Sequence, residues 1–180
     1  MKTADVIIVG SGASGLFNAL FLPQDYKVIV ITKKEVEESD SFLAQGGISA
    51  LKNPEDYDSY FEDTMKAGHY ENDKGAVEKM IKESPQIIQD LKDFGVRFDL
   101  KDGEIEFTRE GGHSTFRILH HEDLTGKEIT SHLYEEAKKR DNITIMENCT
   151  MIDIIEKDGE CKGIVSVSYT HLRAHETKAN

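Results

Sequence analysis

Near its start the chain carries the feature that most constrains its fold, an apolar strand that runs directly into three closely spaced glycines. Residues 6–15 read Val-Ile-Ile-Val-Gly-Ser-Gly-Ala-Ser-Gly. In a Gly-x-Gly-x-x-Gly motif, Gly10 permits the tight turn out of the strand and Gly12 lets the backbone approach a pyrophosphate closely. Gly15 allows the following helix to pack against the sheet, and the unpaired N–H groups at the start of that helix favour an anion.

The sequence around the glycines decides how much weight the motif carries, because such spacing also arises by chance in loops. An apolar helical segment, residues 14–22, follows the turn, and Pro23 ends it. Residues 27–32 then supply a second apolar strand, which completes a βαβ unit. The motif in this context predicts dinucleotide binding; the alternative is a structural turn that holds no ligand.

Composition limits the remaining classes of function. The chain has 180 residues, enough for one domain with a core, and its 22 Lys and Arg against 34 Asp and Glu give a net charge of −12. Nucleic acid is therefore not an expected partner, because a phosphate backbone requires a basic surface. Apolar runs fall short of the ~20 residues of a membrane span and the start lacks a secretory signal, so we expect a cytoplasmic protein.

Cysteine and histidine spacing gives no sign of a metal or a disulfide framework. Cys149 and Cys161 show no zinc-type spacing, and we expect both to be buried small apolar residues. His113, His120 and His121 match no standard metal-binding pattern, and we assign them structural or surface roles.

Periodicity and turn signals outline the rest of the chain. Helices are expected over residues 56–67, 74–83, 85–94 and 125–140, and strands over 96–100, 104–108, 143–147, 150–156 and 162–167. Residues 33–50 and 109–121 are expected to be irregular loops. The pattern indicates an α/β fold with a parallel sheet, a helical insertion and a β-meander. Residues 168–180 are polar and unpatterned, and we interpret them as a disordered or non-native tail after a domain of residues 1–167.

Three further segments give the chain a family resemblance. They are Ala44-Gln45-Gly46-Gly47-Ile48, Thr108-Arg109-Glu110-Gly111-Gly112-His113-Ser114, and the Asp123-x-Thr125-Gly126 turn. Together with the glycine motif they make residues 4–167 resemble the L-aspartate oxidases, FAD enzymes related to the flavoprotein subunits of succinate dehydrogenase and fumarate reductase. The resemblance implies the N-terminal part of a Rossmann-like FAD-binding domain of the glutathione reductase type, incomplete because such enzymes are much longer.

The resemblance also implies which residues contact FAD. The expected contacts are Gly10, Ser11, Gly12, Ala13, Ser14, Gly15, Lys33, Asp40, Ser41, Phe42, Leu43, Ala44, Gln45, Gly46, Gly47 and Thr150. The sequence agrees in part, because Thr32-Lys33-Lys34 stands where an acidic residue often holds the ribose. Taken alone, two lysines would suit the 2′-phosphate of NADP. The family resemblance instead implies that Lys33 contacts FAD. For Lys34, the alternative is a lysine that faces solvent and binds no ligand.

Asp40 bears on how the flavin is attached. In relatives that tether FAD covalently, a histidine lies five positions before the residue that matches Gln45, and here that position is Asp40. We therefore expect noncovalent FAD.

Glu110 carries the main mechanistic hypothesis. An acidic side chain would repel a plain C4 dicarboxylate but attract the ammonium group of aspartate, so it could distinguish the two. The resemblance places this glutamate at the substrate. The alternative is an ordinary loop carboxylate paired with Arg109 or Arg117.

The resemblance implies oxidation of L-aspartate to iminoaspartate, the first step of de novo NAD synthesis, by hydride transfer from Cα to flavin N5. Oxygen or fumarate would accept the electrons, quinolinate synthase is the candidate partner, and the arginine general base lies outside this chain. Two alternatives remain, a noncovalent fumarate reductase or succinate dehydrogenase-like flavoprotein and an inactive truncated nucleotide-binding fragment.

Overall fold

The structure, a computed structural model, describes residues 2–169 and divides into two compact units. Of the described residues, one unit comprises 2–43 and 130–169, and the other comprises 44–129. The tail predicted for residues 168–180 lies largely outside the described residues. Within those residues, no helix is long and apolar enough to cross a bilayer.

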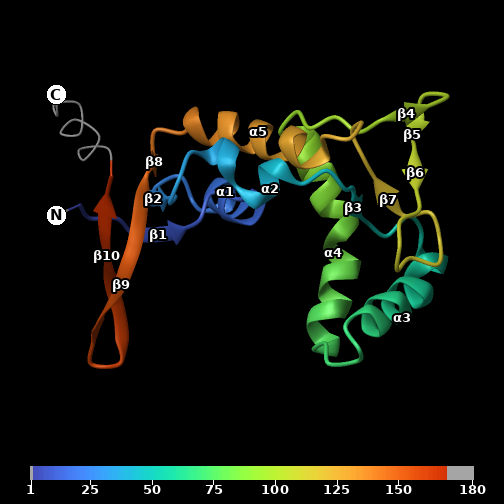
Figure 1. Cartoon of the computed structure of the whole chain (residues 1–180), viewed down its shortest axis with the longest axis horizontal. Coiled ribbons are helices and arrows are strands. Elements are labelled where there is room, and N and C mark those ends of the chain that lie inside the picture. Colours follow the sequence, from blue (N-terminus) through green and yellow to red (C-terminus); the bar gives the residue numbers. More distant parts are fainter. Residues whose placement is uncertain (1, 170–180) are drawn as a thin grey trace, which may run out of the picture. The chain divides into compact units, whose positions relative to one another are not determined.

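A three-stranded parallel sheet forms the centre of the first unit (Figure 1). Its strands lie in the order β1 (Val6–Val9), β2 (Val28–Ile31) and β8 (Ile143–Met146). All four residues of β2 are buried, as expected for a strand between two parallel neighbours. The predicted βαβ unit is confirmed, with α1 (Ala13–Phe21) between the first two strands.

Each face of this sheet is covered by a different element. On one face, Ala19 of α1 packs with Val28 and Val30. On the other, Ile29 and Ile31 pack with the first residue of β9 (Cys149–Lys157), which forms an antiparallel hairpin with β10 (Glu160–Ser168) (Figure 1). These two strands match the predicted strands 150–156 and 162–167 of the meander, and both residues of the Asp158-Gly159 turn have positive φ, as a tight hairpin requires.

The second unit contains the predicted helical insertion. Helices α3 (Tyr57–Ala67) and α4 (Lys74–Asp93) share a core of Tyr60, Met65, Val77 and Ile81 (Figure 1). The 3₁₀ turn η2 (Pro54–Asp56) precedes α3. The helix α5 (Thr125–Lys138), predicted over 125–140, begins in this unit and continues past residue 129.

The prediction of two helices divided before Pro85 is wrong, because α4 continues through the proline. A proline inside a helix leaves the carbonyl four residues earlier without its N–H donor. Here that carbonyl belongs to Ile81, and the Ser84 hydroxyl donates to it at 2.7 Å. The same hydroxyl accepts a hydrogen bond from the Leu51 N–H at 2.8 Å. Ser84 therefore satisfies the carbonyl that the proline leaves without a donor and one further backbone group.

Both segments predicted as irregular loops contain short regular elements. Residues 33–50 include η1 (Val36–Glu38), α2 (Asp40–Leu43) and β3 (Ile48–Ser49), and residues 109–121 include β7 (Ile118–Leu119). Strand β7 pairs on one side with β3 and on the other with β6 (Phe107–Thr108). The predicted hairpin at Asp102-Gly103 is present as β4 (Leu100–Lys101) and β5 (Glu104–Ile105).

Candidate functional site

The glycine turn after β1 has the geometry of a close backbone approach. Gly10 adopts a φ of +116°, which disfavours other residues, and its N–H donates to the Ile31 carbonyl at 2.8 Å. A Cβ on Gly15 would lie 2.1 Å from the Gly10 carbonyl oxygen, so only glycine lets α1 meet the turn this closely. A Cβ on Gly12 would lie 2.8 Å from the Ser41 hydroxyl.

An open cleft of about 390 Å³ lies beside this turn, within the first unit. It is lined by Gly10, Ser11, Gly12, Thr32, Lys33, Lys34, Glu35, Glu38, Ser39, Asp40 and Ser41. Gly12 is the N-cap of α1, no side chain caps the helix, and its first turn holds no acidic residue. The first N–H groups of α1 and the helix dipole therefore make an anion site without a competing carboxylate in that turn.

Side chains at the end of β2 complete the cleft. The Ser11 hydroxyl donates to the Thr32 hydroxyl at 2.8 Å, and both residues are buried, so this bond joins the glycine turn to β2. Lys34 forms an ion pair with Glu38 at 2.8 Å, which raises the pKa of the lysine. Lys33 also lines the cleft and is exposed.

The cleft brings together six of the residues predicted to contact FAD, Gly10, Ser11, Gly12, Lys33, Asp40 and Ser41. Ala13, Ser14 and Gly15 lie in the first turn of α1, and Phe42 and Leu43 lie on α2. Thr150 lies in β9 opposite Val167 and does not line this cleft. The other predicted contacts, Ala44 to Gly47, belong to the second unit.

Within the second unit, the bend at Gly46 and Gly47 lies against Glu110. The Gly47 N–H donates to Glu110 Oε1 at 3.1 Å, and a Cβ on Gly46 would lie 3.6 Å from Glu110 Oε2. Gly47 itself has no room for a side chain, because its Cβ would lie 2.2 Å from Ile118 Cγ2. Two of the segments that carry the family resemblance, residues 44–48 and 108–114, therefore meet in the structure.

Arginine pairing of Glu110, the alternative that the sequence left open, is absent from the described residues. Arg117 pairs with Asp56 and Asp63 instead, and the Arg109 guanidinium lies 6.0 Å from the centre of the Phe116 ring. Glu110 is exposed in this chain and so is accessible to a ligand.

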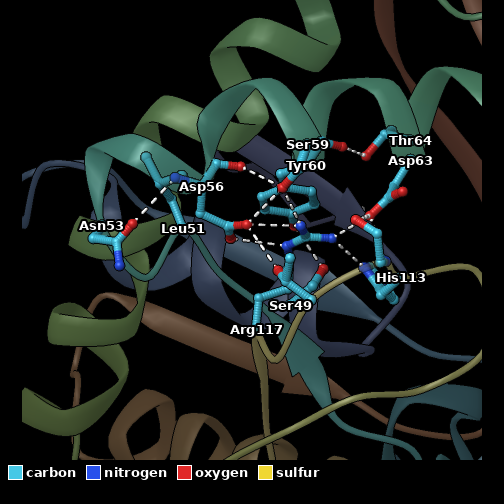
Figure 2. A network of polar contacts seen from close by, with 12 residues as sticks. Ser49, Leu51, Asn53, Asp56, Ser59, Tyr60, Asp63, Thr64, His113 and Arg117 are labelled. Carbon is cyan, nitrogen blue, oxygen red and sulfur yellow. Dashed lines mark hydrogen bonds and ion pairs between the residues drawn. The ribbon is translucent and has the colours of Figure 1, made fainter.

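The same unit contains a buried arginine network that the sequence did not predict (Figure 2). The Arg117 side chain is 0% exposed and binds Asp56 with two nitrogens, Nε to Oδ2 at 2.9 Å and Nη2 to Oδ1 at 2.7 Å. Its Nη1 donates to Asp63 Oδ2 at 2.6 Å, and its guanidinium lies 4.8 Å from the centre of the Tyr60 ring. His113 Nδ1 lies 3.1 Å from Nη1 and must accept this bond, because a guanidinium only donates.

The network keeps both of its carboxylates ionised. Hydrogen bonds from Arg117 lower the pKa of Asp56 from 3.8 to about 2 against the opposing effect of burial. Burial alone would raise the pKa of Asp63, but hydrogen bonds from Ser114 and Arg117 outweigh it and lower that pKa. Burial raises the pKa of Tyr60, whose hydroxyl donates to Ser49 Oγ at 2.6 Å.

The remaining candidates have local structural contacts. His120 Nδ1 and His121 Nδ1 lie 3.1 and 3.4 Å from the Asp99 carboxylate. The described part of the chain holds no group of three or more His, Cys, Asp or Glu placed to bind a metal. Cys149 is buried as predicted; the same prediction for Cys161 is wrong, because it lies exposed beside the hairpin turn.

The family of this fold follows from comparison with known proteins. Residues 5–180 match the FAD binding domain family, and the chain belongs to it. The fit is visible in the turn itself, where the missing Cβ of Gly15 lets α1 begin close to the turn and the uncapped start of α1 leaves N–H donors for a diphosphate. FAD is thus the cofactor of this fold, as predicted.

Comparison with curated proteins shows which members of the family this chain is similar to. The chain is 43% identical over 162 residues to L-aspartate oxidase of Clostridium perfringens and 43% identical over 176 residues to that of Clostridium acetobutylicum. These alignments include 90% and 97% of this chain but 37% and 41% of the relatives. The chain therefore spans about two fifths of the length of these relatives.

Solved structures give the same fold. Escherichia coli quinol fumarate reductase FrdA matches with a TM-score of 0.85 at 26% identity, over 91% of this chain and 29% of that one. Mycobacterium smegmatis Sdh1 in complex with UQ1 matches with a TM-score of 0.82 at 27% identity, over 93% of this chain and 31% of that one. The predicted fold class and the predicted resemblance are both confirmed.

Proposed function

We propose that this chain is the N-terminal part of the FAD-binding domain of an L-aspartate oxidase, a cytoplasmic enzyme that forms iminoaspartate. When bound, FAD supplies the two-electron acceptor, with hydride leaving Cα of L-aspartate for flavin N5. The 43% identity to two L-aspartate oxidases supports this assignment. The observation that carries it is the contact of Glu110 with the Gly46-Gly47 bend.

The chain's own residues supply binding and orientation. The first N–H groups of α1, with Ser11 and Lys33 beside them, hold the diphosphate in the cleft at the glycine turn. The backbone of residues 45–47 would contact the isoalloxazine ring, because two successive residues there carry no Cβ. Backbone N–H groups directed at the edge of a bound ring would stabilise its reduced, anionic form.

Glu110 selects the amino acid over the plain diacid. Two like charges about 4 Å apart repel by about 4 kcal/mol at the effective dielectric of a partly exposed protein site. A carboxylate at Glu110 imposes a repulsion of this order on succinate or fumarate, whereas an ammonium group at Cα turns the same charge into an attraction. Specificity for aspartate then arises from one side chain that both attracts the substrate and repels its analogues.

The test is Glu110→Gln in the full-length enzyme, with aspartate oxidation and fumarate reduction measured side by side. We expect the kcat/KM for aspartate to fall by more than tenfold, since a loss of more than about 1.4 kcal/mol is a factor above ten, while fumarate reduction is retained or improved. Glu104→Gln, a change on the exposed hairpin strand β5, is the matched control and should alter neither reaction. Equal loss of both activities in Glu110→Gln would refute the specificity argument.

Noncovalent FAD is part of the same proposal. Asp40 lines the cleft as a carboxylate, and its side chain lacks the nucleophilic ring nitrogen with which a histidine tethers the flavin in the covalent relatives. Acid precipitation of the flavin-loaded protein should leave all yellow colour in the supernatant. Flavin retained on the peptide after precipitation would contradict this assignment.

A fumarate reductase is the second candidate, favoured by the TM-score of 0.85 with FrdA. Such an enzyme would share the cleft and the glycine bend but would gain nothing from an ammonium ligand. Anaerobic bleaching of the flavin band by L-aspartate, absent with succinate, separates the two. With the oxidase, iminoaspartate passes to the next enzyme of NAD synthesis, and quinolinate synthase is the partner we propose.

A further inference from the structure

Glu110 lies in the loop that joins β6 to β7, and polar side chains of this loop contact α3 and its N-cap residue. The two strands pair through Phe107 with Leu119 and Thr108 with Ile118, so the loop covers residues 109–117. A ladder of only two residue pairs constrains the conformation of few residues outside the two strands. Glu110 is the second residue of this loop, two positions after Thr108 of β6, so contacts outside the strands must contribute to its position.

Polar contacts to two carboxylates hold the second half of the loop. Ser114 donates to Asp63 Oδ2 with both its N–H, at 2.7 Å, and its hydroxyl, at 2.8 Å. The Thr115 hydroxyl donates to Asp56 Oδ1 at 2.8 Å. Arg117, at the end of the loop, binds both carboxylates and is fully buried (Figure 2).

The carboxylates are themselves spaced to receive this loop. Asp56 is the N-cap residue of α3, and Asp63 lies seven positions later, two helical turns along the same face. The side chains are 9% and 16% exposed. The face of α3 thus offers two fixed, ionised acceptors about two turns apart, and the loop lies along them.

The other end of the loop meets the glycine bend. Gly111 and Gly112 follow Glu110, and the Glu110 carbonyl accepts the His113 N–H at 3.2 Å, so a tight turn connects the anchored residues to the glutamate. The Gly47 N–H then donates to the Glu110 carboxylate at 3.1 Å. Glu110 is therefore held from two sides, by its short link to β6 and, through the flexible glycines, by the anchor on α3.

We propose that Asp63 and Asp56, through Ser114, Thr115 and Arg117, are positioning residues that hold Glu110 at the Gly46-Gly47 bend and so set its place at the substrate. The substrate part of this statement rests on the proposed function; the placement of Glu110 does not. All the residues involved belong to one compact unit of the chain.

The experiment is designed to loosen the loop and leave the buried ion pairs intact. Ser114→Ala combined with Thr115→Val removes both hydroxyl tethers and retains Arg117 with its two carboxylates. Ser114→Thr with Thr115→Ser keeps both hydroxyls and is the conservative variant. Ser59→Ala is the matched control, because its hydroxyl contacts the same Asp56 and Arg117 but belongs to α3.

The first readout is the amide proton resonance of Gly47 in the 180-residue chain, since an N–H bonded to a carboxylate resonates well downfield of a free one. Glu110→Ala defines the position of the unbonded amide. We expect the Ser114→Ala/Thr115→Val resonance to move most of the way to that position, and the conservative variant and Ser59→Ala to stay at the wild-type value. An unmoved Gly47 resonance in the tether variant, or an equal movement in Ser59→Ala, overturns the proposal.

The second readout is the ratio of kcat/KM for L-aspartate to that for fumarate in the full-length enzyme. We expect the tether variant to lower this ratio in the same direction as Glu110→Gln, with the conservative variant near wild type. A moved Gly47 resonance with an unchanged ratio supports the placement of Glu110 and contradicts its role toward aspartate. The two proposals can therefore fail separately.

Discussion

Replacing Arg117 with methionine should destabilise the second unit far more than the loss of an ordinary surface ion pair. The methionine fills much of the same volume but leaves Asp56 and Asp63 facing each other with no cation between them. Both carboxylates are largely buried, at 9% and 16% exposure, so water restores little of the lost solvation. Breaking a buried pair in this way costs about 3–5 kcal/mol.

The pKa of Asp56 gives an independent measure of the same interaction. Its fall from 3.8 to about 2 corresponds to roughly 2 kcal/mol of preferential binding of the ionised form, most of it from Arg117. The lowered pKa of Asp63 adds a contribution of the same sign. The two routes agree in sign, and the pKa of Asp56 accounts for part of the expected cost.

Urea unfolding followed by far-UV circular dichroism measures the effect, with hydrogen exchange of peptides from α3 and β7 as the local report. At about 1–3 kcal/mol per molar urea, the unfolding midpoint of Arg117→Met should fall by about 2 M. A triple variant that adds Asp56→Asn and Asp63→Asn should regain much of the loss, because no charge is left unpaired. A cost below about 1 kcal/mol, the range of exposed pairs, or a triple variant no more stable than Arg117→Met, would refute the reasoning.

Three further outcomes follow from the geometry. Gly15→Ala places a Cβ 2.1 Å from a backbone oxygen and should weaken FAD binding at least about tenfold by flavin fluorescence titration, whereas Gly75→Ala in the first turn of α4 should bind normally. Because the folded pKa of Asp56 is lowered, its stabilisation is complete above pH 3.8 and is lost as the pH falls through about 2, so acid titration of Asp56→Asn should show a shallower loss of stability than wild type. Ser84→Ala should cost about 1–3 kcal/mol in urea unfolding, since it strands a carbonyl inside α4 and an N–H from the preceding segment; an unchanged midpoint would mean that water replaces the hydroxyl.

The elements that the sequence predicted well are those whose cause is local. The strand, the three glycines and the following helix are consecutive, and each residue type answers a constraint imposed by its neighbours. The hairpins at Asp102-Gly103 and Asp158-Gly159 are of the same kind, because two residues with positive φ define each turn.

The errors lie where the decisive partner is remote or depends on a side-chain orientation. Helix α4 passes through Pro85 because the Ser84 hydroxyl turns back to a carbonyl, which no pattern of hydrophobicity reports. Strand β7 pairs on one side with β6, ten residues earlier, and on the other with β3, about 70 residues earlier in the chain. A usable signal for the buried network was present, since Arg117 stands in an apolar stretch and Asp56 and Asp63 share one helix face.

The buried charges of this network contribute more to the orientation of the loop on α3 than to the stability of the fold. Well-packed apolar residues would hold α3 against the loop with comparable stability, because desolvation offsets much of the attraction between buried ions. They would not fix the loop's course, since apolar contacts have no preferred direction. The planar guanidinium of Arg117 binds Asp56 with two parallel bonds and Asp63 with a third, which sets both its position and its rotation. The loop of residues 109–117 lies between strands only two residues long, yet it must bring the Glu110 carboxylate to the Gly47 N–H. We infer that its buried ion pairs are retained because they fix the direction of the loop.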